Sequence, residues 1–366
     1  GASTNWQDEI FRTGNTFENN LTLSGGSNKL VYYTSLNAQN QTGILKGSTL
    51  KRYTGRFNAT QKFWDDRLSV DANLTASNTK NRRPSIGGLL GSSIANNPTL
   101  PARDAEGNPA KFENASNPLL DLELFKDIAS VNRVLGNISP TLKIIKGLTY
   151  KLNFGIDNTT TTRDIVNYAN AVPQRDGSFE TQSILLRNRL IENYLTYTTD
   201  IGKHSISALA GHSYQNILYQ YRSSSINKLP LNDLDPIYNP GIGQELTMAN
   251  NRPTGNANIS ELQSYFGRIN YAFENKYLVT ASLRMDGSTK FGENNRYGYF
   301  PSFALGWNIT EEAFMDNSLF STLKLRGGWG MTGNQEIDPK STQPLFKTEV
   351  TSGTSYPLYP SGAYPP

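Results

Sequence analysis

No cysteine occurs among the 366 residues of the sequence, which excludes disulfides, thiolate metal sites and cysteine nucleophiles. No run of about eighteen apolar residues occurs either, which excludes a helical membrane protein. The 35 lysines and arginines nearly balance the 31 aspartates and glutamates. The resulting net charge of +4 is spread along the chain without basic clusters, so we expect no nucleic-acid partner.

Groups suited to catalysis or metal binding are also scarce. The two histidines, His204 and His212, are eight residues apart on one predicted strand, so they would share a face but lie about 26 Å apart. The Asp-Gly-Ser sequence at 286–288 resembles part of a calcium loop, but a strand leading into a loop also explains Asp-Gly. Asp233 and Asp235 lie in a polar loop, where solvated carboxylates are the ordinary case. We predict no catalytic residue, no cofactor site and no metal site, and therefore no enzyme.

The main positive feature is an alternation of apolar and polar residues with a period of two. It recurs in about a dozen segments of roughly ten residues, the length with which a tilted strand crosses a bilayer. The segments 68–76, 148–157 and 277–286 show it most clearly, and 188–199 shows it least. A mean hydropathy of −0.52 fits such strands, because only every second residue must face lipid. A half-buried soluble sheet also alternates, so this pattern alone leaves a soluble β-sandwich open.

Short and long connections also alternate along the chain. Membrane barrels of the up-and-down type show this order, because one rim carries short periplasmic turns and the other carries long extracellular loops. The sequence therefore predicts an all-β, antiparallel, up-and-down transmembrane β-barrel. The predicted tight turns lie near 26–28, 63–66, 145–147, 201–203 and 274–276, and the predicted long loops lie at 39–49, 77–131, 158–187, 214–260, 287–297 and 332–366.

Two local features refine this picture. Thr310, with glutamates at the next two positions, predicts one short periplasmic helix at 310–316, since Thr suits an N-cap and acidic residues suit the first turn. Aromatic residues near the short turns suit an interfacial girdle, although aromatics favour strands in any case. These aromatics are Phe63, Trp64, Phe273, Tyr277 and Trp307.

Four charged residues fall on the polar faces of predicted strands: Asp71, Lys151, Asp157 and Arg284. In a barrel these side chains would line the lumen. Contact with a plug, simple solvation and contact with a transported molecule are all open interpretations for them.

The segment 265–335 carries a series of short motifs. They are Arg284–Ser288 (with Asp286 and Gly287), Phe291-Gly292, Asn294–Arg296, Phe300-Pro301-Ser302, Gly306-Trp307, Glu312-Ala313-Phe314, Leu323–Arg326 and Thr332-Gly333-Asn334-Gln335. A second series lies at 5–12, 24–27, 43–47 and 52–58. In order and spacing, both series resemble the SusC/RagA-like family of TonB-linked outer-membrane transporters. The two series cover about a third of the residues and bracket nearly the whole chain.

The resemblance implies a barrel of about 22 strands closed by an N-terminal plug, which follows a TonB-binding segment. It also implies a location in the outer membrane of a Gram-negative bacterium of the Bacteroidota, among phospholipid and lipopolysaccharide. The implied function is import of oligosaccharides or peptides together with a SusD-like lipoprotein lid, in transporter–lid pairs that form a homodimer. About a dozen strands make roughly half of such a barrel, so we expect the chain to be part of a longer exported protein.

An alternative function is a structural or docking component of a larger cell-envelope assembly, without active import. The sequence does not identify the transported substrate, because similar barrels carry different cargo.

Overall fold

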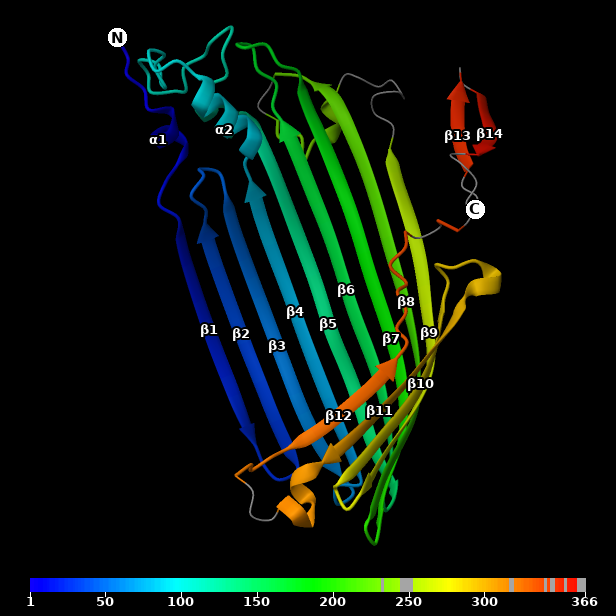
Figure 1. Cartoon of the computed structure of the whole chain (residues 1–366). Helices are drawn as coiled ribbons and strands as arrows, with labels where there is room; N and C mark the ends of the chain where they lie inside the picture. The colour runs from blue at the N-terminus through cyan, green and yellow to red at the C-terminus, as the bar shows by residue number, and fades with distance from the viewer. Residues whose placement is uncertain are drawn as a thin grey trace.

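The computed structural model describes residues 1–231, 234–243, 253–315, 319–338, 341–342, 346–351 and 354–360. Its main body is one antiparallel sheet of 12 strands, in which each strand pairs with the next strand along the chain (Figure 1). This arrangement confirms the predicted all-β, up-and-down architecture. The strands are β1 (Asn15–Gly26), β2 (Leu30–Thr42), β3 (Thr49–Phe63), β4 (Leu68–Arg83), β5 (Phe125–Ile145), β6 (Leu148–Asn167), β7 (Gly177–Ile201), β8 (His204–Leu229), β9 (Thr254–Phe273), β10 (Tyr277–Ser288), β11 (Tyr297–Asn308) and β12 (Lys324–Gly330).

Most strands are longer than the predicted ten residues, and β5 to β8 contain 20 to 26 residues each. The predicted loops 77–131, 158–187 and 214–260 were therefore too wide. The main-chain ladder continues to Arg83, Asn167 and Leu229, because backbone pairing does not require alternating side chains. A tilted strand crosses a bilayer in about 9–11 residues, so these strands extend well beyond one bilayer thickness.

Antiparallel pairing places successive connections on opposite rims of the sheet (Figure 1). One rim carries the tight turns, each within one residue of its predicted position, and also the connection 309–323. The other rim carries the connections 43–48, 84–124, 168–176, 230–253 and 289–296. Part of the predicted loop 332–366 lies outside the described residues, and the described part contains the hairpin of β13 (Phe346–Thr351) and β14 (Thr354–Pro360).

The short-turn rim contains two 3₁₀-helices where the sequence predicts one helix at 310–316. They are η3 (Ile309–Glu311) and η4 (Ala313–Met315), and residue 316 lies outside the described residues. Asn308, rather than Thr310, occupies the N-cap position of η3. The tighter helix forms because the amide of Glu312 donates to the carbonyl of Ile309, and the Glu312 side chain is held back toward the ends of β10 and β11.

Two glycines in tight turns provide a matched test of turn geometry. Gly147 and Gly202 both have positive φ, of 82° and 60°. A Cβ at Gly147 would overlap the main-chain oxygen of Thr198, whereas a Cβ at Gly202 would meet no atom within 4 Å. We predict that Gly202→Ala costs roughly 1–2 kcal/mol of unfolding free energy and that Gly147→Ala costs clearly more. Urea unfolding in detergent micelles measures both, and equal costs would contradict the overlap.

The strand register joins the apolar faces of the individual strands into one continuous apolar face. Leu21, Leu36, Gly55, Ala76 and Val134, for example, form one cross-strand row from β1 to β5. The apolar residues predicted in 68–76, 148–157 and 277–286 all lie on this same face. A barrel whose outer wall contacts lipid needs such a face.

Burial is reversed relative to a soluble sheet. Leu21 and Leu36 on the apolar face are 69% and 58% exposed, whereas Ser264 on the polar face is fully buried. Apolar residues are therefore turned outward and small polar residues are packed inside the curve of the sheet, as a membrane barrel requires. None of the described helices is long and apolar enough to cross a membrane.

Two small apolar cores lie on the long-loop rim. In the first, Val166, Phe179 and Leu229 pack with Ile237 and Ile242 of the connection 230–253. In the second, the helices α1 (Trp6–Ile10), α2 (Ile86–Ala95) and α3 (Pro118–Leu124) pack against one another, and α1 and α2 lie near each other in Figure 1. Their buried residues include Trp6, Ile10, Leu89, Leu119 and Leu120.

Candidate functional site

A row of cationic and aromatic residues crosses the polar face from β6 to β11. In order along the sheet, the row consists of Lys151, Tyr194, Gly211, Phe266, Arg284 and Phe300. A Cβ at Gly211 would overlap the ring of Phe266, so the glycine leaves room for this ring to lean toward Tyr194. The centroids of the Tyr194 and Phe266 rings are 5.7 Å apart, within the range of favourable aromatic pairs.

Arg284 is the most constrained member of this row. Its Nε lies 2.7 and 2.8 Å from the two carboxylate oxygens of Asp286, and its Nη2 donates to the hydroxyl of Ser264 at 2.9 Å. The guanidinium carbon lies 5.3 Å from the centroid of the Phe266 ring, a cation–π distance. A carboxylate, a buried hydroxyl and a ring therefore hold the guanidinium in one place on the polar face.

The motif residues Asp286, Phe300, Gly333, Asn334 and Gln335 lie around one hollow beside Arg284. Its volume is about 370 Å³, and most of the strand residues that line it lie on the polar face near the long-loop rim. A Cβ at Gly333 would overlap the ring of Phe300, so the glycine allows the segment after β12 to cross closely over this ring. Motifs separated by almost fifty residues in sequence thus build one local site.

The remaining motif residues have other positions. Gly287 leaves room for the ring of Tyr297, which a Cβ there would overlap. Pro301 lies on the apolar face opposite Leu283, and its carbonyl accepts from the amide of Met331. Gly306 pairs with Leu278 on the polar face.

Trp307 belongs to a cluster on the short-turn rim that is centred on Glu312. One carboxylate oxygen of Glu312 accepts from the indole nitrogen of Trp307 at 3.1 Å and from the hydroxyl of Tyr277 at 2.6 Å. The other carboxylate oxygen lies 3.5 Å from the ammonium of Lys276. The Gly-Trp and Glu-Ala-Phe motifs therefore fasten the connection 309–323 to the ends of β10 and β11.

This cluster predicts a pH dependence. The hydrogen bond from Tyr277 and then that from Trp307 lower the pKa of Glu312 below its ordinary value of 4.5, with a further contribution from Lys276. A carboxyl whose folded-state pKa is lowered stabilises the fold above its unfolded pKa and loses that contribution as pH falls through the folded pKa. We therefore expect stability to fall below about pH 4.5, and expect Glu312→Gln to remove part of that fall. Identical unfolding curves from pH 7 to 3 for the two proteins would contradict this assignment.

All four charged residues predicted for the lumen lie on the polar face, but they do not form one cluster. Lys151 and Arg284 belong to the row described above. Asp71 accepts a hydrogen bond of 2.6 Å from Thr60. Asp157 accepts two, of 2.9 and 2.7 Å, from the guanidinium of Arg133.

The sequence did not predict a second polar row on the same face. The Nδ2 groups of Asn73, Asn137 and Asn153 donate in turn to Asn137, Asn153 and Glu192, at 3.2, 3.2 and 2.9 Å. This amide row runs from β4 to β7. The alternation placed Asn73 and Asn153 on polar faces, but the pairing that joins them depends on a register that a single sequence does not specify.

The aromatics predicted for a girdle all lie at the short-turn rim, Trp64 in the turn that follows β3, but only three of them are neighbours. Phe273, Tyr277 and Trp307 form one cross-strand row on the apolar face, and His204 extends it onto β8. The imidazole of His204 is within hydrogen-bond distance of the hydroxyl of Tyr271, at 2.7 Å. Phe63 ends β3 on the same face.

Within the described part of the chain, no group of three His, Cys, Asp or Glu side chains is placed to hold a metal ion. His212 lies on the apolar face of β8, with its ring centroid 4.9 Å from that of Tyr265. Asp235 forms an ion pair of 3.1 Å with Lys126, and Asp233 lies outside the described residues.

Comparison with curated proteins finds close relatives over almost the whole chain. The TonB-dependent receptor SusC of Bacteroides thetaiotaomicron is 32% identical over 99% of this chain and 38% of its own length. The TonB-dependent receptor P3 of Formosa agariphila is 31% identical over 95% of this chain and 36% of its own length. The chain thus spans little more than a third of the length of these relatives. No family model matches the sequence.

Solved structures with the same fold include the RagAB peptide transporter. It superposes with a TM-score of 0.84 at 24% identity, over 99% of this chain and 42% of that chain. The RagAB peptide importer in its open-open state gives 0.83 at 24% identity, over 98% of this chain and 41% of that chain.

Proposed function

Since the chain belongs to the SusC-like TonB-dependent receptors, which are outer-membrane β-barrel proteins and not enzymes, we propose that it forms half of the wall of an energy-coupled importer. The cargo is an oligosaccharide or a peptide. The observation that carries the proposal is the 32% identity to SusC over 99% of the chain. In this proposal the energy comes from TonB, acting on a plug in another part of the polypeptide.

The polar face is suited to contact with either class of cargo. Its amide row has donors and acceptors that match sugar hydroxyls as well as peptide groups. Its cation–aromatic row combines Arg284 with the rings of Phe266 and Phe300, which supply apolar contact and a fixed positive charge. The plug of such an importer would contact the same two rows. Movement of the plug would therefore change the surface that the cargo contacts.

The long-loop rim is the proposed extracellular side, where a SusD-like surface lipoprotein acts as a lid. The connection 84–124 and the described residues 234–243 of the connection 230–253 are the proposed lid-facing surfaces. Both lie on the rim opposite η3 and η4, as this orientation requires. The proposal extends to a homodimer of two transporter–lid pairs, within a membrane that contains lipopolysaccharide.

The test is uptake by cells that carry the complete polypeptide and its partner proteins. The probes are fluorescent maltoheptaose for oligosaccharides and a fluorescent heptapeptide for peptides. We expect uptake of one probe class, and expect a protonophore to abolish it. Entry of neither probe, together with purification in a fixed ratio with other envelope proteins, would contradict import and favour the structural or docking role.

Substitutions in the same assay test the cation–aromatic row. We predict that Phe266→Ala combined with Phe300→Ala raises the apparent KM of the imported probe about tenfold, since each lost ring contact removes about 0.5–1.5 kcal/mol. Phe303→Ala on the apolar face of β11 is the matched control, with uptake normalised to the amount of protein in the membrane. An unchanged KM in the double variant would exclude this row from cargo contact.

A further inference from the structure

A hollow of about 810 Å³ lies on the apolar face over β1 to β5. Its floor consists of small residues, Ala38, Gly55 and Ala76, and its sides include Leu21 and Leu36. The larger side chains of the neighbouring strands stand around these small ones and leave a depression in a surface that faces lipid. The apolar floor and the two leucines suit contact with a hydrocarbon chain.

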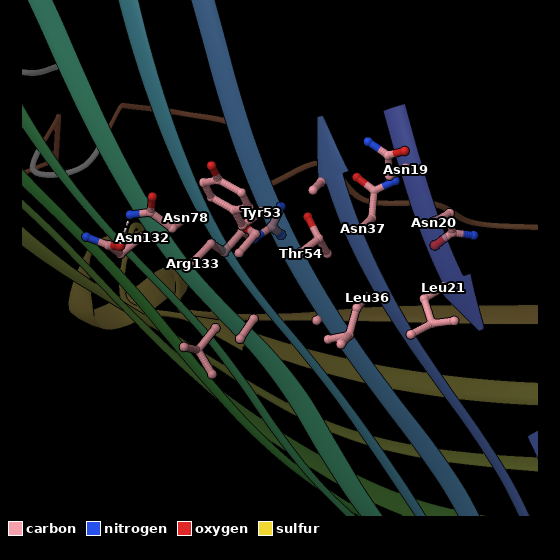
Figure 2. A pocket seen from close by; sticks show the side chains of 15 residues that line it. Asn19, Asn20, Leu21, Leu36, Asn37, Tyr53, Thr54, Asn78, Asn132 and Arg133 are labelled. Atoms are coloured by element: carbon pink, nitrogen blue, oxygen red, sulfur yellow. Dashed lines mark hydrogen bonds between the residues drawn. The ribbon is translucent and has the colours of Figure 1, made fainter. Parts of the chain in front are cut away.

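A row of polar side chains closes the hollow on the side of the long-loop rim. Asn19, Tyr53, Asn78 and Asn132 belong to one cross-strand row with Ala38. The amide of Asn78 donates to the carbonyl oxygen of Asn132 at 2.7 Å, drawn as a dashed line in Figure 2. Figure 2 also shows Leu21 and Leu36 on the far side of the hollow from these amides. Hydrogen-bonding groups thus follow directly after the apolar floor.

Cationic residues follow two positions further along the same strands. Lys51 pairs directly with Lys80, and Thr49 in the next row pairs with Arg82. Both lysines are exposed. Like charges directly opposite each other on neighbouring strands are destabilising, so this pair favours an anion between the two ammonium groups.

The charged residues on the apolar face of β1 to β5 are all cationic, and they all lie at the same end of the strands. All residues of β1 to β5 are described, and their apolar-face positions include no aspartate or glutamate. The lysines and arginines at these positions all lie toward the long-loop end. The described strands therefore offer no carboxylate on this face to neutralise Lys51 and Lys80.

We propose that this surface binds one phosphate-bearing lipid of the outer leaflet. One acyl chain lies in the hollow over Gly55 and Ala76, and Lys51 and Lys80 hold the phosphate. Between them, the polar row of the apolar face contacts the ester or sugar groups; this row consists of Asn19, Tyr53, Asn78 and Asn132. The order of apolar floor, neutral polar row and ammonium pair matches the order of chemical groups along such a lipid. The inference rests on the proposed function in one respect, because that proposal places the long-loop rim outside the cell.

The test is native mass spectrometry of the complete, delipidated polypeptide titrated with lipid A, either phosphorylated or with its phosphates removed. We expect Lys51→Gln with Lys80→Gln to weaken binding of phosphorylated lipid A at least about tenfold, because charge-assisted hydrogen bonds are lost. Dephosphorylated lipid A should bind the unsubstituted protein about as weakly as phosphorylated lipid A binds the double lysine variant. Arg52→Gln with Arg56→Gln makes the same charge change on the polar face of β3 and should leave binding unchanged.

A second variant tests the acyl chain separately. A Cβ at Gly55 would meet only Leu36 Cδ2, at 3.6 Å, so Gly55→Leu places its added carbons in the hollow without displacing the backbone. We expect it to weaken binding of both forms of lipid A.

Three outcomes would overturn the proposal. One is equal binding by the lysine variant and the unsubstituted protein, and another is an equal loss in the polar-face control. The third is displacement of the lipid by inorganic phosphate together with normal binding by Gly55→Leu, which would indicate a site for a free anion. Probe uptake measured in the same variants separates this inference from the proposed function, because the lipid surface lies outside the lumen and uptake should persist without it.

Discussion

Ala281→Lys is expected to destabilise the barrel by about 2–4 kcal/mol, the cost of a lysine near the bilayer midplane on a lipid-facing wall. Ala281 lies on the apolar face of β10 between Ile269 and Phe303. It is four residues from Tyr277 in the aromatic row, so it lies well inside the apolar belt. The small native side chain means that the cost arises from the added charge and not from lost packing.

Ala304→Lys is the matched control on the neighbouring strand. Ala304 pairs with Thr280, one residue from Ala281, but on the polar face of β11. A lysine there would enter the water-filled side of the sheet, and we expect a cost within about 0.5 kcal/mol, as for ordinary exposed substitutions. The measurement is urea unfolding after reconstitution into lipid vesicles. Equal costs for the two lysines would contradict the assignment of the faces.

Asp127→Asn is expected to have an effect of similar size for a different reason. The Asp127 side chain is 6% exposed, and its carboxylate accepts two hydrogen bonds from Arg163, of 2.8 and 2.6 Å. Its Oδ2 also lies 3.4 Å from Nε of Arg83. Breaking a buried pair costs about 3–5 kcal/mol when the other charge stays buried. Because Arg163 keeps 32% exposure, we expect about 2–3 kcal/mol.

Asp157→Asn provides the comparison for this second prediction. Asp157 also accepts two hydrogen bonds from an arginine, but its side chain is 24% exposed and that of Arg133 is 50% exposed. An exposed pair contributes about 0–1 kcal/mol, so this variant should unfold nearly as the unsubstituted protein does. Urea unfolding measures both, and a larger cost for Asp157→Asn would show that burial does not control these two pairs.

The short-turn rim was predictable because its signals are local. Gly147, Gly202 and Asn275 all adopt positive φ, and Gly and Asn adopt this conformation more readily than other residues. The alternation in 148–157 and 277–286 likewise depends only on neighbouring residues. These local features were enough to predict the architecture, and to predict which residues of the clearest strands share a face, without knowledge of the strand pairing.

The long strands and the cross-strand rows were not predictable in the same way. Asp127 fell inside the predicted loop 77–131, because each face of the segment 125–131 mixes polar and apolar residues, so no alternation is visible although the backbone ladder begins at Phe125. Lys151 and Arg284 were recognised one at a time, but their place in one row with Tyr194 and Phe266 depends on the registers of four strand pairs. Register is a long-range property, and a shift by one residue would send each side chain to the opposite face.

The central claim is that one face of the sheet contacts lipid and the other faces the lumen. Single cysteines test it most directly, since this chain has none of its own. The measurement is maleimide labelling of Ala281→Cys and Ala304→Cys in outer membranes that contain the complete polypeptide. A charged, water-soluble maleimide should label position 304 and spare position 281, whereas a bilayer-confined maleimide should label position 281. Labelling of position 281 by the water-soluble reagent, with position 304 accessible only from the bilayer, would contradict the account.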